Sequence, residues 1–240
     1  MPDKAAIIAS LQKDLLFQAF KPVRSGSTME VDMGALNQAF PNGHFPLGAV
    51  HEFACGGMED IAATGGFIAG ILSTLMKNGG VAVWIGRSPA VFPPALQAFG
   101  VEADKLIVID LPKEKDRLWA MEEALKCPGL AAVIAELKEL DFTSSRRLQL
   151  AVEQSRVTGF VIRHSLHTVT TACVTRWKIC ASGSALPGNL PGVGFPSWNV
   201  SLLKVRNGRP GVWQIEWQVN RFVVAGRPAT GLLVQRKEAV

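Results

Sequence analysis

The residues with the clearest potential for chemistry lie where an apolar segment runs into a glycine turn. Residues 49–53 are largely apolar, the turn contains Cys55, Gly56 and Gly57, and a segment of small apolar residues begins near Asp60. A buried strand, a glycine turn and a helix N-terminus, in this order, present backbone N–H groups to a phosphate. This stretch is therefore the first candidate for a nucleotide site.

The stretch lacks the residues that normally hold a triphosphate. The P-loop pattern is G-x-x-x-x-G-K-[ST], in which the Lys reaches the terminal phosphates and the hydroxyl holds the metal. No Gly precedes a Lys anywhere in the chain, and Ile61, Ala62 and Ala63 stand where the Lys and the hydroxyl should be. Glu59 and Asp60 at the turn would repel a bound triphosphate. We expect a degenerate site that binds no nucleotide, made of Cys55, Gly56, Gly57, Asp60 and Ala62.

His51 and Glu52 are a second candidate, because they interrupt an apolar segment. A catalytic pair would need a Ser or Cys nucleophile placed by a motif, and the G-x-S-x-G pattern is absent. We expect a hydrogen-bonded buried histidine and a glutamate at the end of a sheet.

The four cysteines do not indicate a metal site or a disulfide framework. Cys55, Cys127, Cys173 and Cys180 have no C-x-x-C spacing and no paired histidine at ligand distance in the sequence. We expect four reduced, mostly buried thiols, no zinc and no cofactor.

The elements that must position these residues alternate along the middle of the chain. The expected strands are residues 49–53, 81–85, 106–110, 130–135 and 159–163, and the expected helices are residues 60–77, 94–99, 113–126 and 143–156. Short apolar strands separated by helices predict a parallel sheet with helices on both faces. The fold class is therefore α/β, with a three-layer core.

After position 163 the helical pattern stops. Residues 170–179, 199–206 and 212–218 are alternating, aromatic and β-branched, with Pro and Gly between them. We expect them to extend the sheet as an antiparallel meander, with a long loop at residues 182–198.

The two ends of the chain have different patterns. Residues 3–18 carry a helical stripe of Ile7, Ile8, Leu11, Leu15 and Leu16, whereas residues 220–240 show little periodicity. We expect an N-terminal amphipathic helix and linker at 1–28, a core domain at 29–218 and a tail at 219–240. The stripe must pack on the parent domain or on a neighbouring chain, so self-association through this helix is one expectation.

Composition restricts the class of protein. The chain has 240 residues, 48% of them hydrophobic, with a mean hydropathy of +0.20, which suffices for one sizeable domain. We find no apolar run long enough to span a bilayer and no secretory signal, so we expect no membrane contact and a cytoplasmic location.

Charge is unevenly distributed along the chain. Residues 1–140 contain twelve Lys or Arg against sixteen Asp or Glu, a net charge of −4, whereas residues 141–240 contain thirteen against four, a net charge of +9. A basic second half indicates nucleic acid, an acidic partner or simply a solvated basic surface. The candidate contacts are Arg146, Arg147, Arg163, Arg176, Lys178, Lys204, Arg206 and Arg209.

Several segments together resemble a known family. The sequences LGAVHEF, VAVWI, GVEADKLIVID, LAAVIAEL and LLKVRNGRPG resemble the core of the RecA ATPase. Residues 116–163, with SSRRLQLA and VTGF, and residues 194–217 are more closely similar to ImuA, a RecA-related accessory family of bacterial translesion synthesis. The resemblance covers most of residues 39–217. It implies a RecA-like fold and a role in SOS-induced mutagenic repair beside an ImuB-type polymerase homologue.

The resemblance also implies that catalysis has been lost. The glutamate that activates water in RecA is replaced by the segment containing Arg87, and the glutamine that senses the terminal phosphate is replaced by Arg163 and His164. Glu136 stands where RecA has its metal-associated carboxylate, and it is either a remnant of that residue or an ordinary charge at a sheet edge. We therefore expect no ATP hydrolysis.

Three interpretations stay open. The first is a non-catalytic adaptor that binds RecA and an ImuB-type polymerase homologue. The second is a divergent ATPase that uses Glu136 with a non-standard phosphate cradle, and the third is a SulA-like inhibitor of cell division that binds FtsZ. The segments that follow the fourth and fifth strands are too short for the DNA-binding loops of RecA, so any DNA contact should be weak and salt-sensitive.

Overall fold

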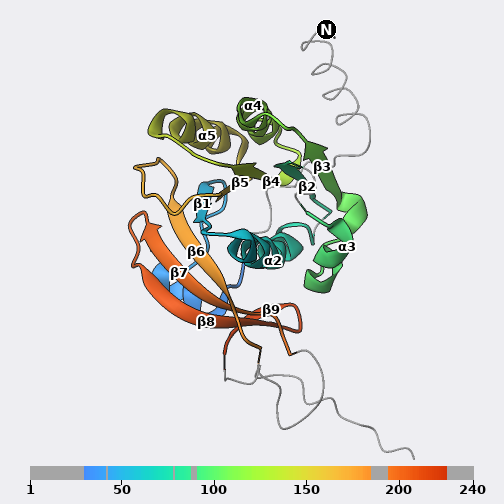
Figure 1. The fold of residues 1–240 in the computed structure, drawn as a ribbon, viewed down its shortest axis with the longest axis vertical. Coiled ribbons are helices and arrows are strands. Elements are labelled where there is room, and N and C mark those ends of the chain that lie inside the picture. Colours follow the sequence, from blue (N-terminus) through green and yellow to red (C-terminus); the bar gives the residue numbers. More distant parts are fainter. Residues whose placement is uncertain (1–29, 42, 78, 88–90, 185–193, 226–240) are drawn as a thin grey trace, which may run out of the picture.

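The computed structural model describes residues 30–225 except 42, 78, 88–90 and 185–193. Its strands form a single nine-stranded sheet in the order β3-β2-β4-β5-β1-β6-β7-β8-β9 (Figure 1). The strands are β1 (Val50–Ala54), β2 (Val81–Gly86), β3 (Leu106–Asp110), β4 (Leu130–Leu137), β5 (Thr158–Arg163), β6 (Thr175–Ser182), β7 (Ser197–Val205), β8 (Gly211–Gln218) and β9 (Arg221–Val224). The helices are η1 (Gly34–Ala39), α2 (Met58–Leu75), α3 (Pro93–Leu96), η2 (Gln97–Phe99), η3 (Ala103–Lys105), α4 (Glu114–Leu125) and α5 (Phe142–Ser155).

The sheet has a parallel half and an antiparallel half. Strands β3, β2, β4, β5, β1 and β6 pair in parallel, and β6 to β9 pair antiparallel. This arrangement confirms the predicted RecA-like α/β fold with a C-terminal meander.

One detail of the predicted meander is wrong. The segment expected as residues 170–179 becomes a strand only at Thr175, and it pairs in parallel with β1, His51 opposite Thr175. Apolar alternation predicts a strand but carries no information on its direction. The chain between β5 and β6 returns along the sheet without a helix, so that antiparallel pairing begins only between β6 and β7.

Helices cover both faces of the parallel half. Helices α4 and α5 pack on one face through residues such as Met121 and Leu148, and α2 packs on the other through residues such as Phe67 and Ile71, all fully buried. Each long helix buries its apolar side against the sheet, and the near-continuous apolar strands such as β1 and β5 are buried on both faces, which gives the three layers.

The antiparallel half curls around α2, so that this helix lies between the two arms of the sheet (Figure 1). A Cβ atom on Gly70 would lie 2.7 Å from the ring of Phe222 and 2.9 Å from that of Trp217, and one on Gly66 would lie 2.9 Å from Phe99. The absence of a Cβ atom at these two glycines therefore permits the aromatic rings to approach the helix closely. Helix α2 is thereby held on both sides.

Strand β9 lies within the range predicted as a tail. Its four residues are too few to show periodicity, but Phe222 is 5% exposed and stacks edge-on against Trp217. The ordered core therefore continues to at least Val224. The predicted N-terminal helix and the rest of the tail lie outside the described residues.

None of the described helices combines the length and the apolar character needed to cross a membrane.

Candidate functional site

The glycine turn after β1 is closed by the protein's own carboxylate. The backbone N–H of Gly56 donates a hydrogen bond to Asp60 Oδ2 at 2.9 Å, and Asp60 lies in the first turn of α2 with Glu59. An acidic side chain at a helix N-terminus takes the place that a phosphate would occupy. The turn thus has the predicted backbone arrangement, but an internal anion fills it.

Cys55 is buried next to this turn and carries no reactive thiolate. Its Sγ atom lies 3.4 Å from Thr64 Oγ1, and burial raises the pKa of the thiol to about 11. A neutral thiol is a weak nucleophile and a poor metal ligand. Within the described residues no group of three or more His, Cys, Asp or Glu side chains could hold a metal ion.

Glu136 lies at the end of β4 and is 6% exposed. Its Oε1 atom accepts a hydrogen bond from Trp84 Nε1 at 2.9 Å, and its Oε2 atom lies 3.7 Å from Nε2 of His164. Burial raises the pKa of Glu136, while the bond from Trp84 and the charge of Arg117 oppose that rise. Burial also lowers the pKa of His164, so its imidazole favours the neutral form. The carboxyl group of Glu136 is therefore only partly compensated.

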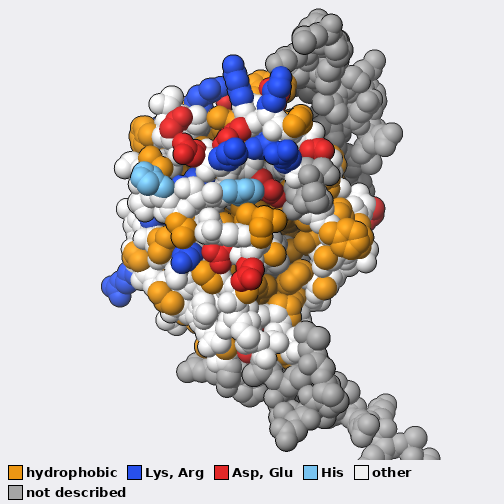
Figure 2. Space-filling model, in the orientation of Figure 1, with side chains coloured by type: hydrophobic (Ala, Val, Ile, Leu, Met, Phe, Trp, Pro, Cys, Tyr) orange, Lys and Arg blue, Asp and Glu red, His pale blue; other side chains and the backbone are white. Residues whose placement is uncertain are grey.

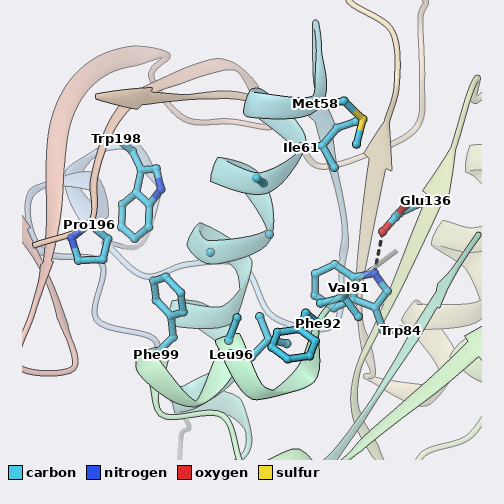
Figure 3. A pocket seen from close by; sticks show the side chains of 14 residues that line it. Met58, Ile61, Trp84, Val91, Phe92, Leu96, Phe99, Glu136, Pro196 and Trp198 are labelled. Carbon is cyan, nitrogen blue, oxygen red and sulfur yellow. Dashed lines mark hydrogen bonds between the residues drawn. The ribbon is translucent and has the colours of Figure 1, made fainter. Parts of the chain in front are cut away.

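On the α2 side of Glu136 lies a cavity of about 320 Å³, which we call the apolar groove. Figure 3 shows how its side chains converge from elements that are distant in sequence. Its main lining residues are Met58 and Ile61 of α2, Phe92, Leu96 and Phe99 around α3, Pro196 and Trp198 at β7, and Trp84 and Glu136 of the sheet. Ala62, predicted as part of the degenerate nucleotide site, also lines this groove.

On the α4 side of Glu136 lies a smaller polar cleft of about 220 Å³. Arg117 projects into this region, and its guanidinium donates to the carbonyls of Glu136 at 2.7 Å and Leu111 at 2.8 Å. Glu114 accepts hydrogen bonds from the backbone N–H groups of Lys138 and Glu139. These groups satisfy one another and fix the loops after β3 and β4. Arg87 also lines the cleft.

His51 is buried and hydrogen-bonded, as predicted, whereas Glu52 lies in the middle of β1 and not at the end of the sheet. The Nε2 atom of His51 lies 2.8 Å from the carbonyl of Pro46 and its Nδ1 atom 2.7 Å from Thr175 Oγ1, and burial lowers its pKa to about 3. A neutral ring must donate to the carbonyl through Nε2 and accept from the hydroxyl through Nδ1. The residue is fully buried and titrates far below physiological pH, so it does not act as a base.

Glu52 sits at the centre of a buried ion cluster. Arg163 Nε donates to it at 2.9 Å, Arg176 Nε at 3.0 Å and Thr171 Oγ1 at 2.8 Å. Arg163 is 1% exposed and Arg176 is 7% exposed. The prediction that these two arginines contact nucleic acid or a partner is wrong, because both charges are enclosed and paired with Glu52.

The other predicted basic contacts are distributed over the surface. Arg146 and Arg147 are exposed on α5 and pair with Glu153 at 3.8 Å and Glu122 at 2.5 Å. In both pairs the arginine side chain is about half exposed, so both cations remain accessible to solvent. Lys and Arg side chains gather along the top of the molecule in Figure 2, and hydrophobic side chains gather below them.

The basic residues of the meander serve mainly to hold the chain between β5 and β6. Lys204 Nζ donates to the carbonyl of Thr171 at 2.8 Å, and Arg206 donates to that of Ala172 at 3.0 Å. Lys178 is half-buried and Arg209 is exposed. The structure thus does not bring the eight predicted cations into one binding groove.

The apolar groove was not predicted from the sequence. Phe99 and Trp198 stack at 6.1 Å between ring centroids although they are far apart in the chain. The sequence signals that could have indicated it are the small residues of α2 and the aromatic residues Phe195 and Trp198. Trp198 packs onto the core at 3% exposure, whereas Phe195 is 44% exposed.

Comparison with known proteins gives one clear relationship. A scan against protein-family models gives no match. Protein ImuA of Caulobacter vibrioides strain NA1000 is 34% identical over 197 residues, which cover 77% of this chain and 81% of the relative. Protein ImuA of strain CB 15 aligns with the same identity and coverage. At this identity and coverage, and with the predicted RecA-like fold in place, the chain belongs to the ImuA family.

Proposed function

We propose that this protein is a non-catalytic RecA-like adaptor in SOS-induced translesion DNA synthesis, and that it binds RecA and an ImuB-type polymerase homologue. Membership of the ImuA family supports a role in the SOS mutagenesis system. The adaptor mechanism, the two named partners and the absence of catalysis are our own inference.

One observation carries the inference of a non-catalytic site. The hydrogen bond from Gly56 to Asp60 places a carboxylate where a phosphate would bind, in a chain that lacks the P-loop lysine. Two negative groups at this position would repel each other, and no lysine is present to offset the charge. ATP binding would require Asp60 to be displaced or protonated.

The remaining architecture suits protein binding. Helix α2 is held between the two arms of the sheet, and an apolar groove opens beside it. A rigid scaffold with exposed apolar surface is typical of a docking protein. Exposed Arg146, Arg147 and Arg209 are compatible with a weak, salt-sensitive contact to DNA.

Co-purification tests the proposal. The tagged full-length chain is co-expressed in separate experiments with RecA, with an ImuB-type protein and with FtsZ, and tag-only samples serve as controls. We expect recovery of RecA and of the ImuB-type protein at defined stoichiometry. Recovery of FtsZ alone would instead select the SulA-like interpretation, and recovery of no partner would refute the adaptor function.

A further inference from the structure

We infer that the apolar groove is a docking site for a segment of a partner protein that inserts apolar side chains and carries a Lys or Arg beside them. This inference rests on the proposed adaptor function and names the surface that would perform it. No nucleotide or phosphate is required for this role.

The rim of the groove exposes large apolar side chains. Met58 is 79% exposed and Phe92 is 69% exposed, and they stand on opposite walls, one on α2 and one at the start of α3 (Figure 3). Scattered single apolar residues are common on protein surfaces, but these two border one apolar cavity and place exposed apolar surface on both of its walls. Covering this patch would remove apolar surface from water.

The floor of the groove allows a partner to lie close to the backbone of α2. Ala62, Gly65 and Gly66 supply little side-chain volume there, and a Cβ atom on Gly65 would meet only Trp84, at 3.8 Å. Pockets for small ligands run from about 300 to 1,000 Å³, so a cavity of about 320 Å³ suits one or two inserted side chains. An amphipathic segment that lays its apolar face into such a groove is a recurring mode of peptide recognition.

The charges around the groove determine the chemistry of the partner. Glu136 is the charged residue among the described lining residues, and Glu59 is exposed on the same turn of α2 as Met58. Arg117 binds the backbone carbonyl of Glu136, and His164 lies 3.7 Å from its carboxylate with a lowered pKa. A cation from the partner would complete the compensation of Glu136, whereas a phosphate would be repelled. The occupant is therefore basic and apolar.

Selection from a library of random 16-residue peptides displayed on phage tests the inference with the immobilised full-length chain. We expect enriched peptides that share apolar residues at helical spacing and a neighbouring Lys or Arg. Synthetic peptides from this set should bind at least about tenfold more weakly to Met58→Asp and to Phe92→Asp, as expected when an apolar anchor meets a charge. Val212→Asp is the matched control, because Val212 is 74% exposed on β8 away from the groove, and it should bind like the unmodified chain.

A second variant tests the charge. Glu136→Gln keeps an oxygen for the bond from Trp84 but removes the negative charge, so it should weaken binding of a peptide with Lys and leave a Lys-to-norleucine version unchanged. Thermal unfolding of each variant shows that the fold is retained. The inference is wrong if no peptide is enriched, if the enriched peptides are acidic, or if the groove variants bind as well as Val212→Asp.

Other occupants of the groove give different outcomes, and each would overturn the inference. Peptide binding that appears only after deletion of residues 226–240 would assign the groove to the chain's own tail. Concentration-dependent dimerisation that Met58→Asp abolishes would assign it to a second copy.

If peptides bind the groove but RecA and the ImuB-type protein do not co-purify, the proposed function fails while the groove assignment stands. If those partners bind Met58→Asp and Phe92→Asp as they bind the unmodified chain, the groove assignment fails alone.

Discussion

Two buried glutamates of the parallel half of the sheet have opposite surroundings. Glu52 of β1 is fully enclosed and bonded to two arginines and a threonine. Glu136 of β4 accepts one bond from an indole, and among the described residues only His164, at 3.7 Å, is a direct ion-pair neighbour. The two residues lie on β1 and β4, the strands that flank β5, with Glu52 in the middle of its strand and Glu136 near the end of its own. The first carboxylate has its partners inside the fold, and the second lies between two cavities.

The contrast distinguishes a carboxylate that is paired within the fold from one that a ligand can reach. A buried carboxylate that is fully paired contributes to the specificity of the fold, and its removal leaves its partners uncompensated. A carboxylate with incomplete compensation beside an open groove is available to a ligand. We therefore assign Glu52 to the architecture and Glu136 to recognition.

The largest expected effect is that of Glu52→Gln. Removing this charge leaves the guanidinium groups of Arg163 and Arg176 buried without a counter-ion, and breaking a buried pair in this way costs about 3–5 kcal/mol of unfolding free energy. Urea unfolding monitored by circular dichroism measures the loss. Glu136→Gln is the matched substitution and should change the free energy by less than about 1 kcal/mol. Equal losses in the two variants would remove the distinction between the two glutamates.

His51, which precedes Glu52 on β1, should make the free energy of unfolding sensitive to acid. Because the pKa of His51 is about 3 in the folded state and near 6.5 when unfolded, protonation favours the unfolded chain as the pH falls below 6.5. The expected loss is about 2 kcal/mol between pH 7 and pH 5. Urea unfolding across this range measures it, and His51→Gln should flatten the profile. A variant profile parallel to that of the unmodified chain would contradict the assignment.

Glu136 should give a smaller dependence of opposite sign. Its pKa is raised in the folded state, so the folded protein holds this proton more tightly, and stability falls as the pH rises from the unfolded value of 4.5 through the folded value. The difference in unfolding free energy between the unmodified chain and Glu136→Gln isolates this term, because the contribution of His51 cancels. A flat difference across this range would show that the carboxylate of Glu136 is fully compensated in the folded state.

Much of the architecture follows from local sequence pattern. Strand β3 has the predicted bounds of residues 106–110, and the strand predicted at residues 159–163 lies within β5. Periodicity and apolar composition act over a few residues, so they determine such elements well.

The parts of the site that were missed depend on contacts between distant positions. Arg163 and Arg176 are buried because Glu52, 111 and 124 residues away in sequence, pairs with both of them. A charge count assigns such residues to the surface by default, since unpaired charges are almost never buried. The apolar groove likewise needs α2, α3 and β7 to be brought together, which no single segment encodes.

The most direct test of the account is equilibrium binding of ATP with magnesium to the full-length chain by isothermal titration calorimetry. Because Asp60 fills the turn after β1 and the P-loop lysine is absent, we predict no detectable binding at millimolar nucleotide. Binding at low micromolar dissociation constant that Glu136→Gln abolishes would contradict the account and identify a divergent ATPase.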